Sequence, residues 1–196
     1  MKTNGTLAII SAPGGGGKNS IISELLKRIP NATRFVTTTT RSMRPAEREA
    51  QDYYFISRPE FEEKIVAGDF VEYNEMVGNL YGTDRIRLTE ALRNHAIVFA
   101  ALDVNGKRSL DTASFPHLSI FILPDSLDAL GARIRRRGGM TEEQISARLT
   151  LAKQEIADAV TYDYHVVNHE GKMMDTVAEI LEILQKQGII DKKARM

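Results

Sequence analysis

The stretch Thr6–Ser20, "TLAIISAPGGGGKNS", decides the fold that the rest of the chain has to fit. It opens with a short apolar run, which is typical of a strand buried on both faces. Glycines follow, and apolar residues then recur at helical spacing from Ile21 to Ile29, until Pro30 ends the pattern. A buried strand, a glycine loop and a helix in this order predict a parallel α/β fold.

The glycine loop has the composition of a phosphate-binding loop. The pattern for such a loop is glycine, four residues, glycine, lysine and then serine or threonine, between a strand and a helix. A flexible glycine-rich turn is the alternative, but the flanking strand, the helix and the lysine favour phosphate binding, because backbone N–H groups and the helix N-terminus converge on the anion. We predict a nucleotide phosphate site made of Ala12, Pro13, Gly14, Gly15, Gly16, Gly17, Lys18, Asn19 and Ser20.

Two letters depart from that pattern, Ala12 and Asn19. Ala12 is a mild change, since a small residue still clears the loop. Asn19 replaces the hydroxyl that would hold Mg²⁺; its amide oxygen can bind a metal, but Mg²⁺ tolerates poor octahedral geometry badly. Ser20 does not simply replace it, because one step along a helix turns the side chain by about 100°. We therefore predict Asn19 as a weak metal ligand.

Composition excludes several classes of protein. Lysine plus arginine and aspartate plus glutamate both total 26 in 196 residues, so nothing suggests binding to a nucleic acid polymer. There is no cysteine, which excludes disulfides, thiolate catalysis and the usual zinc clusters. No apolar run has the length of a signal peptide or a membrane span. We expect a cytoplasmic protein that does not bind membranes.

The remaining pattern predicts a three-layer fold, a parallel sheet with helices on both faces. Further buried strands are predicted within "HAIVFAALDV", "LSIFILP" and "YHVVN". The segment 37–83 breaks the rhythm and is predicted to be an insertion with its own small sheet and a short helix capped by Ser57. The charged stretch "RIRRRGGMTEE" reads as too charged to pack and too rich in glycine to be one helix. The predicted parts are a core of 1–36, 84–132 and 152–196, the insertion 37–83, and a second excursion with its following helix, 133–151.

The insertion carries residues suited to a phosphorylated base. Arg41 and Arg44 are close enough in sequence to clamp one phosphate, and Tyr53 and Tyr81 offer hydroxyl groups, although packing in a sheet explains each tyrosine equally well. Glu72 is an isolated acid in the apolar and aromatic context "DFVEYN". A carboxylate accepts two parallel hydrogen bonds, and guanine offers that pair through N1–H and its 2-amino group, whereas adenine does not.

These motifs, in this order along nearly the whole chain, resemble the guanylate kinase family: "GTLAIISAPGGGGK", "TTRSMRP", "DYYF", "GNLYGT", "LDVNG", "RIRRRGG", "ISARL" and "YDYHVVN". The resemblance implies a P-loop NTPase fold with a GMP-binding insertion at 37–83 and a mobile lid. It also implies transfer of the γ-phosphoryl group from ATP to GMP with Mg²⁺. The implied base contacts are Thr37, Glu72 and Thr83, and the implied ligands of the GMP phosphate are Arg41, Arg44, Tyr53 and Tyr81.

The resemblance assigns further residues to the site. Asp103 would lie between guanine and the water molecules around the metal, and Asn168 would fall in the loop near the adenine of ATP. Together with the loop, the implied catalytic residues are Lys18, Arg41, Arg133, Arg137 and Arg148, of which Arg133 and Arg137 would close on ATP from the lid. The family often has a second acid where this chain has Ala101, so metal affinity and rate are in question more than ligand identity.

Two other functions stay open from the sequence. One is a catalytically silent module of the kind found in scaffold proteins, which the change to Asn19 and Ala101 would allow. The other is a kinase of the same fold that acts on another phosphorylated acceptor, such as a ribose bisphosphate. The lysine of the loop argues against the first, and Glu72 argues against the second, because a sugar phosphate has no use for it.

Overall fold

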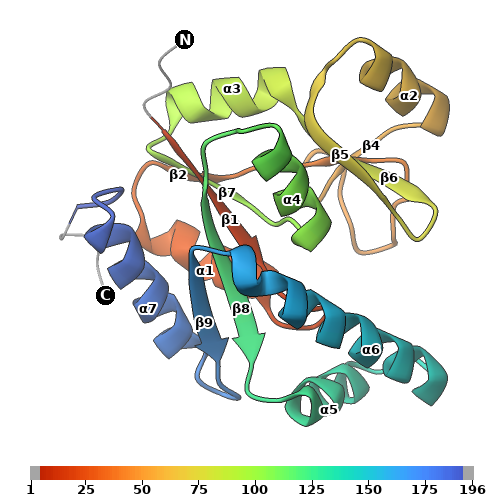
Figure 1. Ribbon diagram of the computed structural model, residues 1–196, viewed down its shortest axis with the longest axis vertical. Coiled ribbons are helices and arrows are strands. Elements are labelled where there is room, and N and C mark those ends of the chain that lie inside the picture. The colour runs from red at the N-terminus through yellow and green to blue at the C-terminus, as the bar shows by residue number, and fades with distance from the viewer. Residues whose placement is uncertain (1–4, 192–196) are drawn as a thin grey trace. The chain divides into compact units, whose positions relative to one another are not determined.

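A computed structural model describes residues 5–191 of the chain (Figure 1). Contacts between Cα atoms divide the chain into two compact units. The central unit contains Asn31–His117 and the described residues up to Leu7, and the loop unit contains Ala8–Pro30 and the chain from Leu118 onward. No helix within the described range is long and apolar enough to cross a membrane.

The loop unit is built on parallel strands. These are β1 (Thr6–Ser11), whose first residues precede the unit boundary, β8 (Leu118–Pro124) and β9 (Tyr164–Asn168). Strand β8 pairs with both of the others. The side chains of Ile9, Phe121 and Val166 are fully buried, which explains why these strands read as continuous apolar runs. All three strands lie where the sequence predicts them.

Helices cover this sheet. They are α1 (Lys18–Arg28), α5 (Leu127–Arg137), α6 (Glu142–Asp158), the short 3₁₀ helix η1 (Ala159–Thr161) and α7 (Met173–Lys186). Helix α7 packs against α1 and β9 (Figure 1). The predicted helical spacing after the glycine loop is confirmed, because Ile21, Ile22 and Leu25 form the buried face of α1.

The charged stretch after β8 differs in one respect from its prediction. The chain does break, since Gly138 and Gly139 have φ of 70° and 77° and α6 then begins at a capping box on Thr141. The prediction that the stretch is too charged to pack is wrong. Ile134 is buried together with Ile145 and neighbouring apolar side chains, because the helix turns Ile134 inward while Arg135, Arg136 and Arg137 stay exposed.

The central unit contains two groups of strands. One is the parallel pair β2 (Ala32–Arg34) and β7 (Ile97–Ala100). The other is a four-stranded sheet in the order β4 (Tyr54–Phe55), β3 (Thr38–Thr39), β6 (Asn79–Asp84) and β5 (Phe70–Met76). The helices are α2 (Arg58–Val66), α3 (Arg85–Asn94) and α4 (Val104–Thr112). The small sheet predicted for the insertion is therefore present, and Ser57 caps α2 as predicted.

The small sheet is apolar on the face that meets α2. Phe61 of the helix stacks on Phe70 of β5, with ring centroids 4.4 Å apart, and Leu80 joins them. A Cβ atom at Gly82 would lie 2.8 Å from both rings, so glycine is needed there for the rings to approach the strand. Because side chains alternate along strands, the other face of β5 and β6 is left for polar residues.

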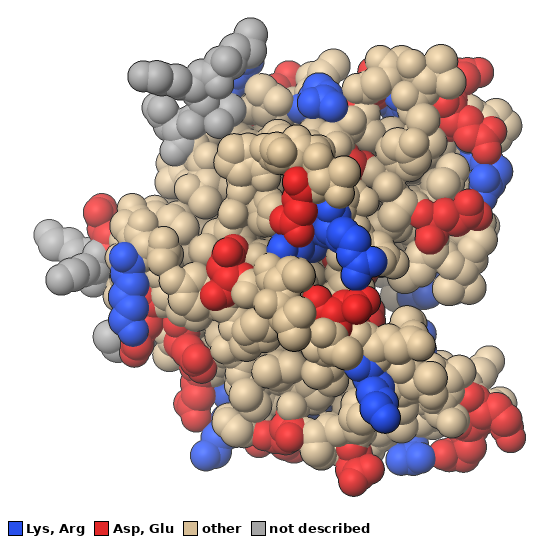
Figure 2. Space-filling view, in the orientation of Figure 1, with Lys and Arg blue, Asp and Glu red and all other residues tan. Residues whose placement is uncertain are grey.

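Charged side chains of both signs are interspersed on the face that Figure 2 shows, as the balanced composition leads one to expect. The predicted insertion 37–83 falls wholly in the central unit, and 133–151 falls wholly in the loop unit. The predicted core is shared between the two units. Its division from the insertion and the lid as functional parts stays a prediction.

Candidate active site

The glycine loop joins β1 to α1 with a backbone that only glycine adopts easily. Gly17 precedes the helix as its N-cap with φ of 93°, in the left-handed region. A Cβ atom at Gly16 would lie 2.8 Å from the Cβ atom of Ala12. Glycine at position 16 thus leaves room for the alanine, which explains how the loop accommodates this departure from the pattern.

Asn168, at the end of β9, supports this loop. Its side-chain Nδ2 donates a hydrogen bond of 2.9 Å to the carbonyl oxygen of Gly16, and its Oδ1 accepts one of 3.3 Å from Thr176. The residue is only 5% exposed. Both ends of the amide are therefore used within the protein, and the predicted contact of Asn168 with ATP stays a prediction.

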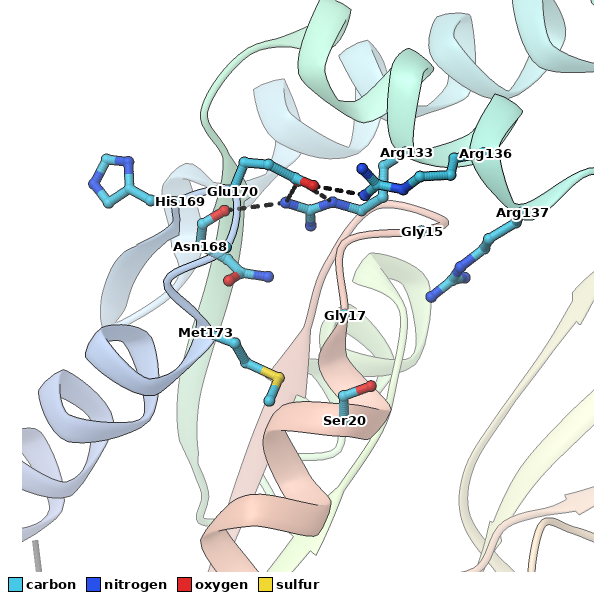
Figure 3. A pocket seen from close by; sticks show the side chains of 11 residues that line it. Gly15, Gly17, Ser20, Arg133, Arg136, Arg137, Asn168, His169, Glu170 and Met173 are labelled. Carbon is cyan, nitrogen blue, oxygen red and sulfur yellow. Dashed lines mark hydrogen bonds and ion pairs between the residues drawn. The ribbon is translucent and has the colours of Figure 1, made fainter.

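A pocket of about 390 Å³ opens beside the loop (Figure 3). A pocket of this volume lies within the range of small-molecule sites. Its lining comes from the loop with α1, the end of α5, and the segment between β9 and α7: Gly15, Gly17, Ser20, Arg133, Arg136, Arg137, Asn168, His169, Glu170, Gly171 and Met173. The structure thus brings predicted phosphate-loop residues together with two of the predicted lid arginines.

Glu170 holds two of the arginines in this pocket, and the sequence gives no signal for it. Its carboxylate accepts hydrogen bonds from Arg133 at 2.9 and 3.1 Å and from Arg136 at 2.6 Å (Figure 3). These guanidinium groups, Arg136 first, lower the pKa of Glu170. Arg133, which was predicted to close on ATP, is therefore paired with a carboxylate in the pocket.

The guanidinium groups of Arg137 and Arg148 form no hydrogen bond or ion pair within the described range. Arg137 extends from the end of α5 toward the part of the pocket lined by Gly17 and Ser20 (Figure 3). Nη1 of Arg148, from α6, lies 3.5 Å from where a Cβ atom at Gly14 would stand. Both guanidinium groups are available to the oxygens of a phosphate chain held by the loop.

Helix α1 presents its positive end to the loop. No side chain caps its N-terminus and no acidic residue stands in its first turn, while Lys27 and Arg28 lie in its last turn. This arrangement favours an anion at the N-terminus. Lys18 is its half-buried first residue and Asn19 is exposed. No cluster of three or more histidine, aspartate or glutamate side chains in residues 5–191 could hold a metal ion.

In the central unit, Glu72 and Thr83 lie opposite each other on β5 and β6. The Thr83 hydroxyl donates a hydrogen bond of 2.6 Å to Oε1 of Glu72. Glu72 is only 6% exposed, and its Oε2 is buried with no hydrogen-bond partner among residues 5–191. A buried carboxylate oxygen without a donor is costly, so this atom calls for a ligand that supplies one.

The surroundings of Glu72 change its acidity. Burial raises the pKa of the carboxyl group to about 7, the hydrogen bond from Thr83 opposes this increase, and the charge of Asp103 adds to it. The carboxyl group is thus divided between its acid and its anion near neutral pH. A ligand that donates hydrogen bonds to both oxygens would stabilise the anion.

Asp103 follows β7 and caps α4. Its Oδ1 accepts a hydrogen bond of 2.8 Å from the N–H of Gly106 and one of 3.4 Å from Nδ2 of Asn74. The other end of that amide, Oδ1 of Asn74, is buried without a partner. Sequence reasoning missed Asn74, although its position two residues after Glu72 on a strand places both on one face.

Arg41 is surrounded by the groups predicted to bind a phosphate with it. The guanidinium carbon of Arg41 lies 5.4 Å from the centroid of the Tyr53 ring. The rings of Tyr53 and Tyr81 lie edge to face, with their centroids 5.9 Å apart. The guanidinium of Arg41 donates to both carboxylate oxygens of Glu47, at 2.7 and 2.9 Å. This ion pair is the main reason that the pKa of Arg41 is raised, whereas burial raises the pKa of Tyr53.

Glu47 also accepts a hydrogen bond of 2.9 Å from the backbone N–H of Arg44. A carboxylate thus lies where the sequence predicts a phosphate, and sequence reasoning did not single it out. Thr37 is half-buried; its carbonyl oxygen accepts a hydrogen bond from Tyr54, and its hydroxyl forms no hydrogen bond within the described residues. Its predicted contact with a base stays a prediction.

Comparison with known proteins agrees with these features. The family model for guanylate kinase matches residues 4–187. A guanylate kinase from Vibrio parahaemolyticus is 43% identical over 85% of this chain and 81% of its own length, and one from Nostoc sp. is 42% identical over 85% and 84%. The crystal structure of guanylate kinase from Anaplasma phagocytophilum covers 100% of this chain and 91% of its own, with 30% identity and a TM-score of 0.75.

These similarities span the glycine loop, the insertion and the C-terminal helices alike. They confirm the predicted α/β fold class, in which a parallel sheet is combined with helices. They also confirm the resemblance that the motifs indicate. This chain belongs to the guanylate kinase family.

Proposed function

We propose that this guanylate kinase transfers the γ-phosphoryl group of ATP to GMP through the two groups of residues described above. The glycine loop, with the arginines around it, would hold the phosphates of ATP. The polar face of the small sheet would bind guanine, and the cluster around Arg41 would bind the phosphate of GMP.

The observation that carries the acceptor assignment is the state of Glu72. One of its oxygens accepts from Thr83 and the other is buried without a donor. Guanine presents two N–H groups side by side, at N1 and at the 2-amino group, and these would complete the hydrogen bonding of the carboxylate. Adenine has no such pair and would leave the buried oxygen unpaired, so the site should discriminate strongly against AMP.

The acceptor phosphate would replace a carboxylate that is already in place. Glu47 accepts hydrogen bonds from the Arg41 guanidinium and from the backbone of Arg44. A phosphate bound by Arg41, Arg44, Tyr53 and Tyr81 would take over these donors. Because the phosphate is anionic before it attacks, the reaction requires no general base.

The donor side would act by neutralising charge. Charge spreads over the equatorial oxygens of the transferring group, and positioned cations stabilise it there. Lys18 would lie against the β- and γ-phosphates, with Arg137 and Arg148 alongside. Arg133 would join them by leaving Glu170. Exclusion of water from the reacting phosphates would favour transfer over hydrolysis of ATP.

Mg²⁺ forms part of this proposal as a partner of ATP. The chemistry that a bound Mg²⁺ would supply is neutralisation of the charge that develops on the phosphates. Mg²⁺ usually keeps several water molecules and takes only one or two protein ligands, so an isolated amide oxygen fits such a site. Asn19, exposed in the first turn of α1, would supply that ligand. The role of Asp103 near the water molecules of the metal stays a prediction.

The structure of the described residues adds no observation in favour of either alternative. A silent module does not need the lysine and the packed glycines of the loop, and a kinase for a sugar phosphate has no use for the unpaired oxygen of Glu72. The cytoplasmic location and the absence of a nucleic acid partner stay predictions.

Release of ADP from ATP tests the proposal, with GMP, AMP or no acceptor, over a titration with Mg²⁺. We expect turnover that depends on GMP and saturates at millimolar Mg²⁺. Equal rates with GMP and AMP would contradict the role of Glu72. Binding of GMP without turnover at any concentration of Mg²⁺ would instead contradict the proposed donor site.

A further inference from the structure

Asn74 lies on the same face of β5 as Glu72, and the family assignment of base contacts does not include it. Its two ends differ in their hydrogen bonding. Nδ2 donates to Oδ1 of Asp103 at 3.4 Å, whereas Oδ1 is buried and accepts no hydrogen bond. The contact with a carboxylate decides which way the amide faces, because only the N–H₂ end donates hydrogen bonds.

Two unpaired acceptors therefore lie two residues apart on one strand, Oε2 of Glu72 and Oδ1 of Asn74. Side chains at such positions point the same way, with backbone positions separated by roughly 7 Å along the strand. A ligand that satisfies both atoms must therefore carry at least two N–H bonds that point in different directions. Buried acceptors without partners are rare in folded proteins, so each of these atoms calls for a donor from a ligand or a bound water molecule.

Guanine has a donor left over once Glu72 is satisfied. The carboxylate accepts N1–H and one N–H of the 2-amino group, and the second N–H of that amino group still needs an acceptor. Close to Glu72, the Thr83 hydroxyl already donates to the carboxylate, and Oδ1 of Asp103 already accepts two hydrogen bonds. Within the described residues, Oδ1 of Asn74 is a buried acceptor that takes part in no hydrogen bond, and it belongs to the same face of β5 as Glu72.

We propose that Asn74 is a specificity-determining residue, which accepts the second N–H of the guanine 2-amino group through Oδ1 while Nδ2 stays bonded to Asp103. The proposal rests on the assignment of guanine to Glu72. It gives the site a means to recognise the 2-amino group separately from N1–H.

Inosine monophosphate tests this inference, because it keeps N1–H and the phosphate but lacks the 2-amino group. KM for GMP, and inhibition of GMP turnover by inosine monophosphate, should be measured in the unchanged protein and in Asn74→Ala. Loss of one neutral hydrogen bond should weaken GMP binding about 3- to 10-fold. Binding of inosine monophosphate should change by less than about twofold, since it makes no use of the acceptor.

Matched variants make the outcome decisive. Asn79→Ala, in the exposed turn at the end of the same hairpin, should change neither constant. Asn74→Leu keeps the branched shape of the side chain without an acceptor and replaces the alanine variant if that variant unfolds. An equal effect of Asn74→Ala on both nucleotides, or no effect on either, would overturn the proposal and indicate a role through Asp103 or in packing alone.

Glu72→Gln separates this inference from the one beneath it. One outcome would refute the role of Asn74 alone. In that outcome, Glu72→Gln lowers the preference for GMP over AMP, and Asn74→Ala leaves the preference for GMP over inosine monophosphate unchanged. If Glu72→Gln has no effect on base preference, guanine is not bound there, and both assignments fail together.

Discussion

The two proposed nucleotide sites, one in each unit, hold their polar groups in opposite ways. In the central unit, Glu72 and Asn74 are fixed by strands and carry buried oxygens without donors. In the loop unit, Arg137 and Arg148 are cations with no ion pair among the described residues, and they lie beside a loop whose backbone is set by glycine. A buried acceptor distinguishes ligands by their hydrogen bonds, whereas cations at a loop attract any polyphosphate. Base selection and charge neutralisation are thus assigned to different kinds of structure.

Removal of the charge at the loop should have the largest effect on turnover. Lys18→Ala should lower kcat by about 100- to 1,000-fold, as found when one positioned donor to a transition state is removed. The affinity for GMP should stay unchanged, because the acceptor residues belong to the central unit. Steady-state release of ADP at saturating nucleotide measures the loss.

Lys27→Ala is the matched control for this variant. Lys27 is on the same helix, is 67% exposed and pairs with Glu24 at its far end, so kcat should not change. Weaker GMP binding with an unchanged kcat in Lys18→Ala would contradict the assignment of charge neutralisation to the loop and of base selection to the small sheet.

The free energy of unfolding should depend on pH because the carboxyl group of Glu72 is buried. The pKa of Glu72 is about 7 in the folded chain, whereas the ordinary value, which we take for the unfolded chain, is 4.5. Between these values the folded state holds a proton that the unfolded state has released, so stability without nucleotide falls as pH rises through this window. Glu72→Gln cannot ionise and should be more stable than the unchanged protein by about 3 kcal/mol near pH 8.

Urea denaturation near pH 5 and near pH 8 measures this difference, which should shrink toward the lower pH. Glu75→Gln, an exposed position on the same strand whose carboxylate pairs with Arg58, should follow the pH profile of the unchanged protein. Parallel profiles for Glu72→Gln and the unchanged protein would show that burial does not perturb this carboxyl group.

The smallest expected effect concerns the carboxylate inside the cationic pocket. Glu170→Ala should lower KM for ATP about two- to fivefold, because it removes one negative charge and frees Arg133 and Arg136 for phosphate. The effect should weaken as salt increases.

Glu142→Ala breaks a comparable exposed ion pair, with Arg135, at residues that do not line the pocket. It should leave KM for ATP unchanged. A rise in KM for Glu170→Ala would mean that the carboxylate positions Arg133 for ATP and does not compete with it.

The order of elements could be predicted from the sequence because it depends on local pattern. Apolar runs predicted the strands β1, β8 and β9. A glycine loop followed by apolar residues at helical spacing predicted α1. The candidate residues Lys18 and Glu72 were also visible locally, one from its motif and the other as a lone acid among apolar neighbours. The charged stretch around Ile134 was misjudged, because composition does not reveal which residue a helix turns inward.

Partners that meet across the fold were decided by tertiary structure. Glu170 with Arg133, and Asn168 with the loop carbonyl of Gly16, join segments more than 30 residues apart in sequence. The hydrogen bond from Arg41 to Glu47 also depends on how strands and loops pack. The same is true of Oδ1 of Asn74, which has no partner among the described residues. The sequence by itself determined the family, the strand–loop–helix frame and the classes of ligand. Which polar atoms are satisfied and which are left for a ligand depends on strand register and helix ends, because a hydrogen bond requires atoms to meet within about 3 Å.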